Sequence, residues 1–270
     1  MYDFPELRPA HDILWGALAE RLEAAGVTQV PGRLTRDLAH QDTWRHPRLL
    51  FGQACEYPLA TAFAGSVRLL ATPRYMAAGC EGHSYRSVVV VRAQDDAAGL
   101  AELRNRRCAI NEPDSNSGMN LMRAALVGIA RRGRAFFSSI TLSGSHRRSA
   151  ELVANGQADV AAIDCVTFAH LRRLYPEAVA GLRILCWTPS SPSLPFITAA
   201  STGEATLRAL RAALAAVFDD PSPAVRAARA MLLLDGVNLQ PDLRLSEVRR
   251  LARQAAALGL EPVLSEAVVT

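Results

Sequence analysis

Two short serine-rich segments carry the side chains best suited to chemistry in this chain of 270 residues. Residues 115–118 have the sequence Ser-Asn-Ser-Gly, and residues 143–146 have the sequence Ser-Gly-Ser-His. Each follows an apolar run typical of a strand and precedes a helical pattern. Small polar residues at a helix start cap its free N–H groups, and the same groups attract anions. Each segment alone is explained most simply as a helix cap, whereas two on one sheet edge favour an anion site.

Other side chains near these segments extend the candidate site. His146 can donate a hydrogen bond to an anion oxygen. The alternative interpretation is that it is simply an exposed residue at a helix start. Asp164 follows the apolar run 159–163 and is either another helix cap or a partner for a ligand amine. Tyr57 and Tyr85 each offer a ring face and a hydroxyl to the opposite wall of a cleft. Together they suggest a ligand that carries both an anionic head and a donor group.

Short apolar strands that alternate with helices should position these segments. This alternation predicts an α/β fold with mostly parallel sheets flanked by helices. The helices after residue 204 have no strands of their own and must pack on earlier elements. The predicted strands cover 49–51, 67–71, 87–91, 108–110, 140–142, 159–163, 183–187 and 194–199, and the predicted helices cover 9–25, 118–131, 166–174, 204–218, 222–233, 246–258 and a stretch around 150–154.

One lobe interrupted by another explains this order of elements. We expect a discontinuous lobe 1 formed by residues 1–87 and 190–270, and a lobe 2 formed by residues 88–189. The ligand cleft is expected between the two lobes.

The sequence argues against several other classes of protein. The formal net charge is +4, but no basic stripe with interleaved aromatic residues suggests nucleic-acid binding. No apolar run approaches the ~20 residues of a membrane span. There is no nucleophile elbow, phosphate loop or dinucleotide fingerprint, and no cysteine or histidine pair has metal-ligand spacing. We therefore expect no catalysis, no metal and no cofactor.

The five cysteines and the first residues bear on the compartment. Cys55 and Cys80 both lie in loops near glycines, and a disulfide between them is an open possibility in an exported protein. Residues 1–5 lack the basic start and apolar stretch of a signal peptide, which taken literally indicates the cytoplasm.

The segment 143–149, followed by Ala-Asn-Gly-Gln-Ala-Asp-Val-Ala-Ala-Ile-Asp at 154–164, resembles the phosphate, phosphite and phosphonate substrate-binding components of ABC transporters. The resemblance is clearest over residues 45–200, and residues 114–118 match the helix start of that family. It implies a two-lobed type II periplasmic-binding-protein fold and a monomer that delivers a ligand to a membrane permease. It also implies a periplasmic location, with the cytoplasm as the alternative.

By this resemblance, two groups of residues would share the ligand. The anionic head would be held by Ser115, Asn116, Ser117, Ser145 and His146, and the remainder would contact Tyr57, Tyr85 and Asp164.

Some residues depart from the family pattern. Asn116 stands where many members have Ser or Thr, and Glu56 adds negative charge, so bare phosphate is disfavoured. The alternatives to a transport role are a sensor and an enzyme of cofactor biosynthesis on the same fold.

Overall fold

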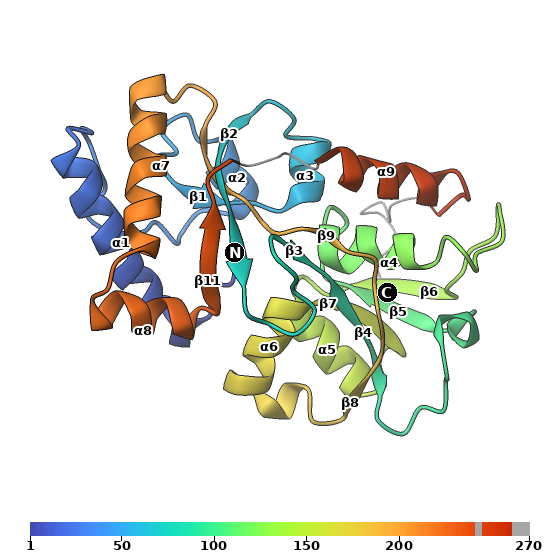
Figure 1. Ribbon diagram of the computed structural model, residues 1–270. Coiled ribbons are helices and arrows are strands. Elements are labelled where there is room, and N and C mark those ends of the chain that lie inside the picture. Colours follow the sequence, from blue (N-terminus) through green and yellow to red (C-terminus); the bar gives the residue numbers. More distant parts are fainter. Residues whose placement is uncertain (241–244, 261–270) are drawn as a thin grey trace. The chain divides into compact units, whose positions relative to one another are not determined.

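The computed structural model describes residues 1–240 and 245–260 and divides them into two compact units (Figure 1). Both units are discontinuous in sequence. The first contains residues 1–76, 81–83 and 193–240, and the second contains residues 77–80, 84–192 and 245–260.

The first unit packs helices on one antiparallel sheet. The strand order is β1-β10-β2-β11, and each neighbouring pair is antiparallel. Its helices are α1 (Arg8–Ala24), α2 (His40–Arg45), α3 (Glu56–Ala60), α7 (Glu204–Phe218) and α8 (Pro223–Met231), and its strands are β1 (Gly52–Gln53), β2 (Val67–Tyr75), β10 (Phe196–Ala199) and β11 (Leu234–Asn238).

Helical spacing of apolar residues builds the core of the first unit. Trp15, Leu18 and Leu22 lie on one face of α1 and are buried against Leu210 and Leu214 of α7. Helix α1 ends where Gly26 adopts a φ of +78°, which is costly for other residues. The predicted helices at 9–25 and 204–218 are confirmed within one residue.

Two predictions for the first unit were wrong. Residues 49–51 are not a strand, because β1 begins only at Gly52. The chain after residue 204 does contain a strand: β11 pairs antiparallel with the second half of β2. Its sequence, Leu-Asp-Gly-Val-Asn, is short and interrupted by a glycine, so it gives only a weak alternating pattern.

The second unit contains a mixed sheet with the order β6-β5-β7-β4-β8. Strands β6, β5 and β7 run parallel, whereas β4 is antiparallel to both β7 and β8. The main strands are β4 (Ser87–Arg92), β5 (Arg107–Ile110), β6 (Ser139–Leu142), β7 (Val160–Asp164) and β8 (Leu182–Trp187), and a small ribbon joins β3 (Ser84–Tyr85) to β9 (Ser191–Pro192).

The prediction of mostly parallel sheets was therefore wrong. Val88–Val91 of β4 are completely buried, as their unbroken apolar run indicates. Such a run shows that both faces of a strand are covered, but it carries no information on the strand's direction.

The helices of the second unit are α4 (Leu121–Ala125), α5 (His146–Ala154), α6 (Cys165–Leu174) and α9 (Leu245–Ala256). The helix predicted at 118–131 is shorter than expected, because the chain first forms a π-helical turn, η3 (Asn116–Asn120).

Helix α9 belongs to the second unit, although the sequence placed residues 190–270 in lobe 1. Its buried face packs against α4. The amide of Gly133 donates to the Leu258 carbonyl at 3.2 Å, and Nε of the buried Arg123 donates to the Leu260 carbonyl at 2.5 Å. These contacts involve residues far apart in sequence, so periodicity alone gives no sign of them.

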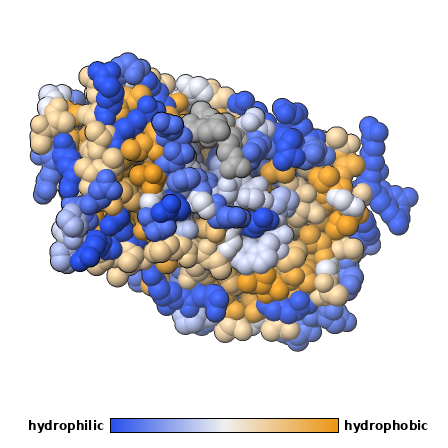
Figure 2. Space-filling view, in the orientation of Figure 1, coloured by the Kyte–Doolittle hydropathy of each residue, from blue (hydrophilic) through white to orange (hydrophobic). Residues whose placement is uncertain are grey.

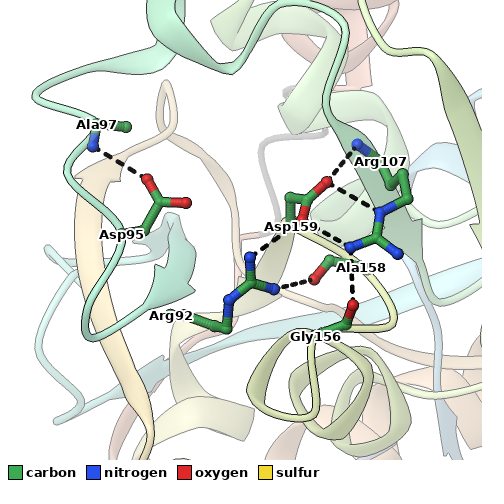
Figure 3. A network of polar contacts seen from close by, with 7 residues as sticks. All are labelled: Arg92, Asp95, Ala97, Arg107, Gly156, Ala158 and Asp159. Atoms are coloured by element: carbon green, nitrogen blue, oxygen red, sulfur yellow. Dashed lines mark hydrogen bonds and ion pairs between the residues drawn. The ribbon is translucent and has the colours of Figure 1, made fainter.

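One carboxylate ties together three strands of the second unit at the edge where β5 and β7 begin (Figure 3). Asp159 accepts from the Arg107 amide at 2.9 Å and from Arg107 Nη2 at 2.9 Å, and also from Arg92 Nη2 at 3.2 Å. The Arg107 guanidinium holds the pKa of Asp159 well below its usual range. Asp159, which lies in the run 154–164 that resembles the transporter family, is thus a structural anchor for β4, β5 and β7.

The surface is of an ordinary mixed kind. Hydrophilic residues are scattered over both units in the view of Figure 2, with apolar residues between them. Among the described helices, none is both long enough and apolar enough to cross a bilayer.

Candidate functional site

The loops that follow β5 and β6 lie side by side at one edge of the second unit's sheet. The amide of Ser143 donates to the Ile110 carbonyl at 2.8 Å, and the amide of Gly144 donates to the Asn111 carbonyl at 2.9 Å. Gly144 has a φ of +81°, which lets the second loop turn sharply into α5. The two serine-rich segments are therefore brought together, as the shared sheet edge predicted.

Ser115 begins the π-helical turn η3 as its N-cap. Its hydroxyl accepts from the Gly118 amide at 3.0 Å, and its carbonyl accepts from the Asn120 amide at 3.0 Å. A Cβ on Gly118 would lie 1.8 Å from Asn111 Oδ1 and 3.3 Å from His146 Cε1. Glycine at this position is thus required by the close approach of both loops.

Three side chains converge across these loops, and we call them the Ser-His cluster: Ser115, Ser117 and His146. Ser117 Oγ lies 2.7 Å from His146 Nε2 and 3.3 Å from Ser115 Oγ. Ser115 and Ser117 are buried, and His146 is half-buried. The cluster presents hydroxyls and an imidazole, which can all donate hydrogen bonds to oxygen.

Burial lowers the pKa of His146 to about 4, although the nearby Ala162 backbone acts in the opposite direction. The imidazole is therefore neutral at pH 7. A group of neutral donors at a sheet edge can accept an anion without a fixed cation beside it.

The start of α5 adds backbone donors to this cluster. Ser145 is its N-cap, and the Ser145 hydroxyl accepts from the Arg148 amide at 3.1 Å. The other first-turn N–H groups have no acceptor within a helix. Arg147 and Arg148 both reach Glu151 on the same helix, and Arg147 also covers the Tyr175 ring at 3.9 Å. Their charges are directed along α5.

Asn116 and Tyr85, both predicted as ligand contacts, are buried inside the second unit. Asn116 Nδ2 donates to Tyr85 Oη at 3.1 Å and to Ser191 Oγ at 2.8 Å. Asn116 Oδ1 accepts from Asn120 Nδ2 at 2.9 Å. These hydrogen bonds fix the η3 turn to the β3–β9 ribbon.

Asp164, at the end of β7, caps helix α6. Its carboxylate accepts from the Thr167 amide at 2.7 Å, and the residue is 2% exposed. The structure thus supports the helix-cap interpretation of Asp164. Its strand ends at the same sheet edge as those that precede the Ser-His cluster, because β7 is parallel to β5.

Glu56 and Tyr57 belong to the first unit, in the first turn of α3. Glu56 is 1% exposed, and Tyr57 is half-buried. Their predicted contribution to the ligand site stays a prediction.

The first unit also contains an apolar cavity of about 320 Å³. Its walls include Trp15, Trp44, Phe51 and Phe196, and none of the predicted site residues lines it.

Sequence reasoning missed three residues that hold the site together. Asn111 packs against Gly118, Ser87 Oγ donates to the Ser117 carbonyl at 3.0 Å, and Ser191 accepts from Asn116. The glycine at 118, directly after the capping residues, was the one available sign of a close approach there.

This arrangement of two discontinuous α/β units, with a donor cluster at a sheet edge, defines the class of type II periplasmic binding proteins. The profile of a family described as "ABC transporter, phosphonate, periplasmic substrate-binding protein" matches residues 11–236. The chain belongs to this family of phosphonate-binding components, which confirms the resemblance inferred from the two serine-rich segments.

Solved structures share the fold of this chain. XAC2383 from Xanthomonas citri, solved with chloride, is 20% identical with a TM-score of 0.69 and covers 96% of this chain and 95% of its own. A binding component of an ABC phosphonate transporter from Pseudomonas aeruginosa is 19% identical, with a TM-score of 0.68 and coverage of 90% and 81%.

PhnD1 from Prochlorococcus marinus, solved with methylphosphonate, is 14% identical, with a TM-score of 0.73 and 95% of each chain covered. At these identities the likeness shows the fold alone. Among curated proteins, none matches this chain significantly.

Proposed function

We propose that this chain is the solute-binding protein of an ABC-type uptake system and that it binds a small phosphonate through the Ser-His cluster. The observation that carries the proposal is the position of Ser117 Oγ, which lies within hydrogen-bonding distance of both Ser115 Oγ and His146 Nε2. Three donor side chains on two adjacent loops match the three oxygens of a tetrahedral anionic head.

The backbone supports the same ligand. Helix α5 directs the positive end of its dipole and its first-turn N–H groups toward the sheet edge where the cluster lies. Neutral donors stabilise an anion by several hydrogen bonds of about 1.5–3 kcal/mol each. We expect binding to depend on the number of correctly placed oxygens more than on total charge.

The roles of the other candidates follow from their contacts. Ser145 and the α5 N–H groups belong to the anion site. Asn116 and Tyr85 act as positioning residues, because the Asn116 amide is bonded to protein groups. Asp164 forms the α6 cap, so a ligand amine would have to reach a buried carboxylate.

A non-enzymatic role in the periplasm, with a membrane permease as partner, is part of this proposal. Its support is the family description, which names a periplasmic substrate-binding protein. The chemistry of the cluster agrees, because the neutral His146 contacts the Ser117 hydroxyl without any carboxylate in the described hydrogen bonds of the pair. A hydrolytic Ser–His pair relies on such a third group to orient the base.

Isothermal titration calorimetry against methylphosphonate, phosphite, phosphate and ATP tests the ligand class. We expect methylphosphonate to bind and S117A to weaken it about tenfold or more. Ser139→Ala is the matched control, because Ser139 is exposed at the opposite end of β6. Equal affinities of S117A and wild type would exclude the cluster, and conversion of the ligand, seen by mass spectrometry, would overturn the non-enzymatic role.

A further inference from the structure

Two of the five cysteines lie in contact within the second unit. Cys80 Sγ is 3.4 Å from Cys165 Sγ, although the residues are 85 positions apart. All five cysteines fall in the described part of the chain, and this is the one cysteine pair there with such a contact. The sequence had suggested Cys55 as the partner of Cys80, but the structure places Cys165 beside it.

The segment that carries Cys80 is held firmly. The Cys80 amide donates to the Ala77 carbonyl at 3.0 Å, which closes a turn over residues 77–80. Gly79 in this turn has a φ of +95°, and a Cβ there would lie 2.2 Å from a ring carbon of Trp187. The turn therefore packs its backbone directly on the indole ring, and this contact directs Cys80 toward α6.

Cys165 is fixed just as well on the other side. It is the first residue of α6, it is 2% exposed, and its amide donates to the Arg86 carbonyl at 3.2 Å. Cys80 is half-buried, so it is the more exposed residue of the pair.

We propose that Cys80 and Cys165 form a reversible disulfide when the protein meets a disulfide oxidant. The two sulfur atoms must approach by about 1.4 Å to reach the bond length of ~2.05 Å. The gap to close is therefore shorter than one bond length.

The reaction is thiol–disulfide exchange with an external disulfide such as oxidised glutathione. The Cys80 thiolate attacks one sulfur of the oxidant and releases one glutathione thiol, leaving a mixed disulfide on Cys80. The Cys165 thiol loses its proton, attacks Cys80 Sγ and displaces the second glutathione thiol. Two protein thiols are oxidised to one disulfide while one oxidant disulfide is reduced to two thiols.

The surroundings of the two thiols set the order of these steps. A hydrogen bond with the Cys80 thiol, burial and the neighbouring Asp164 carboxylate all raise the pKa of Cys165. Cys165 is therefore a poor first nucleophile, and the accessible Cys80 reacts first. Cys165 completes the reaction once Cys80 carries a leaving group.

The bond would fasten residues 77–80 to α6. This segment belongs to the second unit, but the chain on both sides of it, up to residue 76 and at 81–83, belongs to the first unit. Oxidation therefore fixes a stretch through which the chain passes between the units, one residue away from the α6 cap at Asp164. This role is independent of the ligand that the Ser-His cluster binds.

Treatment of the whole protein with oxidised glutathione tests the proposal. We expect the wild type to lose two of its five free thiols and to yield a disulfide-linked peptide pair containing Cys80 and Cys165. Cys165→Ser should instead trap a glutathione adduct on Cys80, whereas Cys80→Ser should gain no adduct on the buried Cys165. Cys108→Ser, on strand β5, is the matched control and should form the disulfide like the wild type.

Three results would overturn the proposal. They are five free thiols in the oxidised wild type, a peptide that links Cys80 to Cys55, and a stable glutathione adduct on wild-type Cys80. The thiol count and the search for a glutathione adduct are both made on the wild-type protein. The test therefore does not depend on the folding of any variant.

Discussion

Ser117 Oγ lies 2.7 Å from His146 Nε2, and this contact joins the loop after β5 to the start of α5. The two residues are 29 positions apart, so their hydrogen bond exists only because β5 and β6 are parallel neighbours. The bond holds the orientation of the imidazole that faces the proposed ligand.

The affinity for an anionic ligand should therefore depend on pH through His146. Burial lowers the pKa of His146 to about 4, so its imidazole is neutral at pH 7 when no ligand is bound. A bound anion favours the imidazolium and raises this pKa, and binding then takes up a proton. We expect methylphosphonate affinity to rise by up to about tenfold per pH unit as the pH falls from the raised pKa of the complex to about 4, the pKa of His146 in the free protein.

Calorimetry in two buffers with different ionisation enthalpies measures this proton uptake. His146→Asn keeps a side-chain donor but removes the titrating group. The pH dependence of the variant then reports only the titration of the ligand itself. Identical pH profiles for the variant and the wild type would show that His146 takes up no proton.

The substitution G118A should destabilise the protein and weaken binding together. A Cβ would meet Asn111 Oδ1 at 1.8 Å, and we expect a loss of about 2 kcal/mol in the free energy of unfolding. Urea unfolding measures the loss, and Asn111→Ala in the same chain should restore much of it. Gly128→Ala is the control, because nothing lies within 4 Å of its Cβ; equal losses at both positions would contradict the steric argument.

Asn116→Ala should separate positioning from direct binding. The substitution removes the amide that bonds to Tyr85, Ser191 and Asn120, and we expect a loss of about 2 kcal/mol or more in the free energy of unfolding. S117A removes fewer hydrogen bonds, so it should cost only about 1 kcal/mol in unfolding while it weakens ligand binding. If N116A unfolds like the wild type but no longer binds, Asn116 contacts the ligand after all.

Asp159→Asn should lower stability at neutral pH by about 2 kcal/mol, because it weakens the bonds to Arg107 and Arg92 (Figure 3). The folded-state pKa of Asp159 lies below its ordinary value of 3.8, so its contribution is complete above that value and fades as the pH falls further. The difference between variant and wild type should shrink in acid unfolding titrations. Asp96→Asn, at an exposed position, should behave like the wild type.

The sequence indicated that the two serine-rich segments meet, but it did not indicate the contacts that their side chains make. Serine and glycine after a strand mark a capped helix start, and two such starts on parallel neighbours must meet at one edge. Asn116 and Tyr85 have the same polar character as the residues of the Ser-His cluster, and only the fold shows that their polar atoms bond to protein groups. The sequence also did not predict that β4 runs antiparallel to its neighbours, because an apolar run indicates the burial of a strand and not its direction.

The β3–β9 ribbon bears on which changes of sequence length the second unit tolerates. The chain enters the main part of the second unit at Ser84–Tyr85 and leaves it at Ser191–Pro192, and these two strands pair with each other. A segment whose two ends lie side by side can be lengthened or replaced without changing the path of the chain before and after it. The Ser-His cluster is therefore carried by one continuous stretch of the chain, residues 84–192, against which α9 packs from a later part of the sequence.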